Sequence, residues 1–190
     1  ASKEEYEKVN VTQTLELAKK AKESGVKHFV FMSTVKVYGE ETNKKYTESS
    51  ICNPEDEYGK SKLKAEQELL GLSDEGLGFR VSIIRTPIVY GYGVKANIKN
   101  LVTLVNKIPI LPFAKIENKR SMVYIGNLCH LVDEVITQKK SGIFLASDDE
   151  PLSTTRLIEL IANGLGKKVY LIKVPFFESL LKPSFHKRLY

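Results

Sequence analysis

The sequence predicts an α/β fold with a parallel sheet, because helix-like and strand-like apolar patterns alternate along the chain. Residues 28–32 form a nearly continuous apolar run, which is typical of a strand buried on both faces of such a sheet. Residues 11–22 instead repeat apolar side chains at helical spacing, with Leu15 and Ala18 on one face. Alternation at this period implies β-α-β units joined by right-handed crossovers.

In the first half of the chain, turn residues separate the expected elements. Gly25 follows the end of the first helix, and Pro54 lies in a polar loop before the second. The predicted elements are a helix over 11–22, a strand over 28–32, a loop over 38–57, a helix over 58–70 and a strand over 80–85.

The second half mixes short strands and helices around a proline-bounded irregular segment, residues 108–112. Ser153 or Thr154 is expected to cap the last helix, which ends near Gly164. We therefore divide the chain into residues 1–95 and an interleaved second region, residues 96–190. The other predicted elements are helices over 98–107 and 127–138 and strands over 122–125, 142–146 and 169–174.

The composition describes an ordinary globular chain of 190 residues, 42% hydrophobic and 27% charged. No apolar run approaches the ~20 residues that span a bilayer, so we expect no membrane partner and a cytoplasmic location. The net charge of +6 comes from scattered basic residues and one denser stretch, residues 182–188, and does not indicate nucleic acid. The cysteines and histidines lack the spacing of metal ligands, so no metal is expected.

The most informative side chains are Tyr58 and Lys62, four residues apart at the start of a predicted helix. Positions i and i+4 share one helical face, so a phenol and an ammonium can reach one substrate atom. A tyrosine with an ordinary pKa of about 10 is a weak base at neutral pH, and a nearby lysine favours its phenolate. The pair suits proton transfer with a substrate hydroxyl, although an amphipathic surface helix would show the same spacing.

Two hydroxyl side chains, Ser33 and Thr34, end the strand that precedes this helix. A hydroxyl at this place can hydrogen-bond the substrate oxygen that Tyr58 would protonate or deprotonate. It can equally cap the local backbone. Asn10 has the same two interpretations, as a residue of the site or as an ordinary helix cap.

Four motifs follow one another in a recognisable order. They are the strand 29–39 with Ser33 and Thr34, the helix entry 53–62 with Tyr58 and Lys62, the strand end and turn 85–91, and the segment 119–125 around Arg120. Together they resemble the extended short-chain dehydrogenase/reductase family, in its branch of NAD-dependent sugar-nucleotide epimerases and dehydratases. The resemblance runs from about residue 6 to residue 175. It implies part of a Rossmann-like, doubly wound parallel sheet with a smaller C-terminal substrate-binding lobe.

The resemblance implies catalytic roles for Tyr58, Lys62 and Thr34. Tyr58 would be the acid/base, Lys62 would stabilise its phenolate and bind the nicotinamide ribose, and Thr34 would supply the catalytic hydroxyl. The resemblance also implies which residues bind the cofactor and which bind the substrate. The cofactor would be bound by Tyr58, Lys62, Ser33, Pro87 and Ile88. The substrate would be bound by Thr34, Asn10, Asn97 and Arg120.

The glycine-rich turn that holds the pyrophosphate of NAD in this family has no counterpart in the sequence. Gly91 and Gly93 have no third glycine at the required spacing. We therefore expect the chain to be the later part of a longer protein, to bind NAD poorly alone and to be inactive alone. The residue that would distinguish NAD from NADP is missing with it.

The resemblance implies a UDP-sugar 4-epimerase, acting on UDP-glucose/galactose or their N-acetyl forms and serving polysaccharide biosynthesis. Dehydratases of the family carry an acidic pair directly after the catalytic threonine, where this chain has Val35 and Lys36. Two alternatives stay open, an NADP-dependent carbonyl reductase of the same family and a non-catalytic fragment. A homodimer is compatible with either enzyme.

Overall fold

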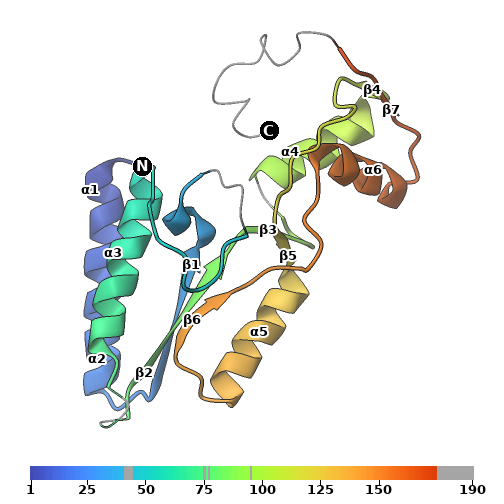
Figure 1. Ribbon diagram of the computed structural model, residues 1–190. Coiled ribbons are helices and arrows are strands. Elements are labelled where there is room, and N and C mark those ends of the chain that lie inside the picture. Colours follow the sequence, from blue (N-terminus) through green and yellow to red (C-terminus); the bar gives the residue numbers. More distant parts are fainter. Residues whose placement is uncertain (41–44, 75, 77, 95, 175–190) are drawn as a thin grey trace. The chain divides into compact units, whose positions relative to one another are not determined.

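The computed structural model describes residues 1–40, 45–74, 76, 78–94 and 96–174. The chain divides into two compact units, which Figure 1 shows in the colours of the sequence. The chain leaves the first unit in β3 (Ile88–Tyr90) and returns in β5 (Met122–Tyr124), so the two units are interleaved. The basic stretch predicted over residues 182–188 lies outside the described residues. The first unit is Ala1–Ile88 with Val123–Ser147, and the second is Val89–Met122 with Asp148–Tyr190.

The first unit is built on a parallel sheet of three strands in the order β1-β2-β6. These strands are β1 (His28–Thr34), β2 (Arg80–Thr86) and β6 (Gly142–Leu145). β1 and β2 run in register from the pair His28 and Arg80 to the pair Thr34 and Thr86. The carboxyl ends of the strands therefore meet at one edge, and the predicted α/β fold with a parallel sheet is confirmed.

A nearly continuous helical segment precedes the sheet and starts earlier than the sequence led us to expect. It consists of α1 (Lys3–Tyr6), the π-helical η1 (Glu7–Gln13) and α2 (Thr14–Glu23). The predicted start at residue 11 is wrong, because Ser2 and Glu5 form a capping box that begins the helix at Lys3. This signal was present in the sequence as a serine followed three residues later by a glutamate.

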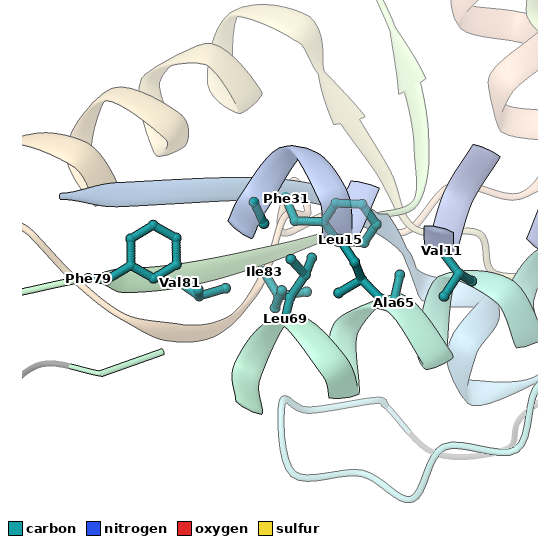
Figure 2. Close-up of a cluster of buried hydrophobic side chains, with 9 residues drawn as sticks. Val11, Leu15, Phe31, Ala65, Leu69, Phe79, Val81 and Ile83 are labelled. Atoms are coloured by element: carbon teal, nitrogen blue, oxygen red, sulfur yellow. The ribbon is translucent and has the colours of Figure 1, made fainter. Parts of the chain in front are cut away.

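The core of the first unit lies between the helices and one face of the sheet. α3 (Glu57–Leu72) lies beside α1, η1 and α2 and packs on β1 and β2. Figure 2 shows the side chains that converge from these elements, and α5 (Ile125–Thr137) lies on the other side of the sheet in Figure 1. Met32 is 39% exposed, so the prediction that this strand is buried on both faces is wrong there. The cluster contains Val11, Leu15, Ala18, Phe31, Ala65, Leu69, Phe79, Val81 and Ile83.

The second unit has a smaller core of its own, between two helices and two short strands. α4 (Ala96–Lys107) and α6 (Thr154–Gly164) pack together, and β4 (Ile110–Leu111) pairs in parallel with β7 (Tyr170–Leu171). Ser153 caps α6, as one of the two predicted caps, by accepting a hydrogen bond from the Arg156 backbone at 3.0 Å. The buried residues of this second core are Val105, Leu111, Phe113, Ile116, Ile158 and Ala162.

A salt bridge between Glu66 of α3 and Arg85 of β2 lies inside the first unit, with 1% and 2% of these residues exposed. Arg85 Nη2 donates to Glu66 Oε2 at 2.6 Å, and Arg85 Nε donates to both carboxylate oxygens at 3.1 and 3.2 Å. The Ser33 hydroxyl at the end of β1 also donates to Glu66. Burial alone would lower the pKa of Arg85, but the hydrogen bonds to Glu66 and the charge of Glu66 raise it.

Removing one partner of this pair should destabilise the fold strongly. Arg85→Met should lower the free energy of unfolding by roughly 3–5 kcal/mol, because it leaves the Glu66 carboxylate buried without a cation. The double variant Glu66→Leu/Arg85→Met should lose less, because it removes both charges from the interior. Urea unfolding would measure both, with Lys60→Met in the exposed Lys60–Glu57 pair as a control that leaves stability unchanged. A double variant less stable than Arg85→Met would contradict this prediction.

Candidate active site

The start of α3 is fixed by Asp56, which is its N-cap residue. Asp56 Oδ1 accepts a hydrogen bond from the Gly59 backbone at 2.7 Å, and Asp56 itself has an extended backbone. This cap places Tyr58 in the first turn of the helix and Lys62 one turn further on. The predicted helix over 58–70 is confirmed, with one more residue at its start and two more at its end.

Lys62 lies against the carboxyl end of β1. Its Nζ donates to the Met32 carbonyl at 2.9 Å and lies 4.4 Å from the centroid of the Phe31 ring. Burial lowers the pKa of Lys62, and the charge of Glu66 partly opposes this shift. The ammonium is therefore held at the edge of the sheet where α/β proteins bind their ligands.

Tyr58 is half-buried beside the aromatic ring of Tyr6. The two ring centroids are 5.7 Å apart, and the ring planes are tilted by 55°. Burial raises the pKa of Tyr58, the charges of Asp56 and Tyr6 raise it further, and Lys36 opposes them. The lowering of this pKa that the sequence led us to expect is thus not seen here, where Lys62 bonds to Met32. In this state Tyr58 is a phenol and can donate a proton.

The two strand-end hydroxyls have different surroundings. Thr34 Oγ1 accepts a hydrogen bond from the Lys36 backbone at 3.3 Å and caps the 3₁₀ turn η2 (Val35–Tyr38). Ser33 points into the interior, where its hydroxyl donates to Glu66. Thr86 on the neighbouring strand fixes this segment by donating to the Ser33 carbonyl at 2.9 Å.

Asn10 is joined to the first turn of α3 through a serine. Asn10 Nδ2 donates to Ser61 Oγ at 2.9 Å, and Ser61 Oγ donates to the Tyr58 carbonyl at 2.8 Å. Asn10 lies in η1, where the Thr12 hydroxyl donates to the Glu7 carbonyl and the Thr14 hydroxyl, at the start of α2, donates to the Val9 carbonyl. The amide of Asn10 thereby fixes the backbone that carries Tyr58.

The remaining predicted residues belong to different parts of the chain. Pro87 and Ile88 follow β2 and are partly exposed. Asn97 is an exposed residue of α4 in the second unit. Arg120, also in the second unit, pairs its backbone with Leu152 at 2.9 and 3.0 Å, and burial lowers the pKa of its guanidinium. The structure thus gathers Asn10, Thr34, Tyr58 and Lys62 around the start of α3 and the end of β1.

Sequence reasoning missed several polar residues that hold this arrangement. Glu66 follows Tyr58 and Lys62 at the same spacing of four, so the periodicity could have placed it on their helical face. Arg85 is a charge inside an apolar strand, which indicates a buried partner. Asp56 precedes the helix at the N-cap position, three residues before Gly59.

The side chains at the carboxyl edge of the sheet fit the nicotinamide half of NAD. An ammonium has three N–H donors, and the Met32 carbonyl accepts one from Lys62, which leaves the other two for ribose hydroxyls.

Among the described residues, no group of three or more His, Cys, Asp or Glu side chains is arranged to hold a metal ion. No helix in the described part of the chain is long and apolar enough to cross a membrane.

A tyrosine–lysine pair on a helix, beside a hydroxyl at the end of a parallel strand, is the side-chain set of the short-chain dehydrogenases/reductases. The chain belongs to the NAD dependent epimerase/dehydratase family, whose model matches residues 1–145. This assignment confirms the resemblance seen in the sequence motifs.

Two curated relatives illustrate the range of the family. The chain is 42% identical over 177 residues to a UDP-glucose 4-epimerase of Vibrio cholerae, and this match covers 90% of the chain and 54% of that protein. It is 29% identical over 157 residues to a dTDP-4-dehydro-6-deoxyglucose reductase of Escherichia coli, and this match covers 78% of the chain and 49% of that protein. The chain spans about half the length of the curated relatives it matches.

Solved structures share the fold. A UDP-N-acetylglucosamine 4-epimerase from Methanobrevibacter ruminantium M1, in complex with UDP-N-acetylmuramic acid, superposes with a TM-score of 0.72 at 22% sequence identity. The match covers 87% of this chain and 56% of that chain. The Rossmann-like character of the fold is thereby confirmed.

The close approach of α3 to η2 leads to a prediction about two glycines of one helix. A Cβ added at Gly59 would lie 2.9 Å from the Lys36 carbonyl oxygen, whereas one added at Gly71 meets nothing within 4 Å. Gly59→Ala should therefore destabilise the fold by about 1–3 kcal/mol through overpacking. Gly71→Ala should stabilise it by up to about 1 kcal/mol, because alanine favours the helix. Thermal unfolding of both variants checks the pair, and equal shifts would show that no tight contact exists at Gly59.

Proposed function

We propose that the protein, at its natural length, is an NAD-dependent nucleotide-sugar 4-epimerase that acts on UDP-glucose/galactose or their N-acetyl forms. The observation that carries the proposal is the set of Tyr58, Lys62 and Thr34 around the start of α3 and the end of β1. The similarity to the Vibrio cholerae UDP-glucose 4-epimerase supports the choice of substrate.

The residues of this chain have separate tasks in the proposed reaction. When bound, NAD would supply the hydride chemistry, which is removal of a hydride from C4 of the sugar and its return to the other face of that carbon. Tyr58 takes the proton of the C4 hydroxyl and later gives it back, which is general acid/base catalysis at the phenol oxygen. Thr34 orients the same oxygen by a hydrogen bond. Lys62 binds the nicotinamide ribose and adds positive charge, which favours the phenolate form of Tyr58.

The residues after Thr34 favour epimerisation over loss of water. Val35 has no acidic or basic group, and the Lys36 ammonium is paired with Glu40 and Asp56 at 2.7 Å each. Neither side chain is available as the carboxyl acid and carboxylate base that elimination of water needs. Epimerisation requires only the acid/base pair, the hydroxyl and the cofactor.

A second candidate is an NADP-dependent carbonyl reductase. It is favoured by the similarity to the dTDP-4-dehydro-6-deoxyglucose reductase, since a reductase uses the same tyrosine, lysine and hydroxyl. The two candidates differ in the role of Arg120 where the reductase acts on small ketones, because these, unlike a dTDP-sugar, have no diphosphate for an arginine to hold. We propose that Arg120, with Asn97, contacts the nucleotide diphosphate of a UDP-sugar, for which a planar guanidinium is well suited.

Replacing the acid/base should abolish most of the turnover. Tyr58→Phe, in the protein at its natural length, should lower kcat for UDP-glucose epimerisation by about a hundred- to ten-thousand-fold, because only the reacting hydroxyl is lost. NAD affinity and thermal stability should stay close to those of the parent. Tyr92→Phe, at a fully exposed tyrosine, is the matched control and should keep full activity. Near-normal epimerisation by Tyr58→Phe would rule out this mechanism.

Arg120 separates the two candidate functions. Arg120→Ala should weaken UDP-sugar binding by roughly 1.5–3 kcal/mol, because a charge-assisted hydrogen bond to the diphosphate is lost. Arg120→Lys should recover only part of this affinity, because an ammonium keeps the charge but lacks the planar set of N–H donors of a guanidinium. Calorimetry with UDP-glucose and UDP-N-acetylglucosamine measures both, with NAD affinity as the internal control. Unchanged UDP-sugar affinity together with turnover of small ketones would favour the reductase.

A further inference from the structure

Lys36 lies in η2, two residues after Thr34, and is held by two carboxylates. Its Nζ is 2.7 Å from Asp56 Oδ2 and 2.7 Å from Glu40 Oε1. Asp56 uses its other oxygen to cap α3 through the Gly59 backbone. One carboxylate therefore joins the turn after Thr34 to the helical turn that carries Tyr58.

The backbones of the same two segments are also in close contact. The position of a Cβ on Gly59 would be 2.9 Å from the carbonyl oxygen of Lys36, a distance at which only glycine fits. The Lys36–Asp56 ion pair thus spans a place where η2 and α3 already touch. Both side chains are about 40% exposed, so the pair contributes little to the stability of the fold.

We propose that Lys36 is a positioning residue of the active site, which acts through Asp56. Its ion pair holds the first turn of α3, and with it Tyr58, against the turn after Thr34, and it offsets the negative charge that Asp56 presents to Tyr58. The inference rests on the proposed function, in which Tyr58 is the acid/base. Nothing in that function requires a cation at position 36.

The charged groups around Tyr58 give Lys36 and Asp56 opposite electrostatic effects. Burial raises the pKa of Tyr58, and Asp56 at the N-cap and Tyr6 of α1 raise it further. Lys36 lowers this pKa from η2, while Lys62 on α3 bonds to the Met32 carbonyl. Removing Lys36 should therefore raise the pKa of Tyr58, and neutralising Asp56 should lower it.

The test uses two isosteric or nearly isosteric changes in the protein at its natural length. Asp56→Asn removes the charge and keeps an oxygen that can cap α3, and Lys36→Met removes the charge and keeps the length of the side chain. The pH at which kcat/KM for UDP-glucose reaches half its maximum should rise in Lys36→Met and fall in Asp56→Asn, each by about half a pH unit. Lys36→Arg should restore the parent profile.

Lys60→Met is the matched control, since it removes a cation from the same helical turn that pairs with Glu57 on α3 alone. It should leave the pH profile unchanged. A purely structural role of the Lys36–Asp56 pair would lower kcat in both variants without opposite shifts in the profile. Shifts in one direction, or no shift in either variant, would overturn the proposal.

A second measurement separates this inference from the proposed function. The resonance of isotope-labelled Tyr58, assigned with Tyr58→Phe, reports its pKa without any substrate. Opposite shifts of this pKa in Lys36→Met and Asp56→Asn would support the inference, even if the enzyme did not turn over UDP-sugars. Absence of UDP-sugar turnover would refute only the proposed function. Equal pKa values of Tyr58 in the parent and both variants would refute the inference, even if the enzyme turned over UDP-sugars.

Discussion

The carboxylate of Glu66 is the point on which the first unit depends. It accepts hydrogen bonds from Arg85 of β2 and from Ser33 of β1, while its own backbone belongs to α3. A buried ion pair costs desolvation energy on both sides and is retained only where its geometry satisfies both charges. Here the geometry also fixes the rotation of α3 about its axis, because the carboxylate can reach both strands from one orientation only.

That rotation determines where the reactive side chains lie. Tyr58, Lys62 and Glu66 follow one another at intervals of four and share one face of α3. Glu66 is buried at the inner end of this polar stripe, and Lys62 lies one turn nearer the carboxyl edge of the sheet, on the Met32 carbonyl. The charge of Glu66 opposes the lowering of the Lys62 pKa by burial, so the anchor of the helix also helps to keep the lysine cationic.

Periodicity in the sequence was sufficient for the sheet, for α3 and for the positions of Tyr58 and Lys62, because apolar spacing determines these features. It was not sufficient for the directions of Ser33 and Asn10, whose hydrogen bonds depend on Glu66 and Ser61, 33 and 51 residues away. The alternation of a strand could have distinguished the two hydroxyls. Ser33 lies two residues after the buried Phe31 and shares its face toward α3, whereas Thr34 does not.

The two carboxylates that hold α3 differ in burial, and this difference separates their effects. Glu66 is 1% exposed, so its ion pair acts on the stability of the whole unit. The Asp56 side chain is 40% exposed, so its ion pair with Lys36 is screened and adds little to stability. Asp56 nevertheless lies two residues before Tyr58, near enough to raise its pKa. The helix is therefore anchored at a buried carboxylate, and the pKa of its tyrosine is raised by an exposed one.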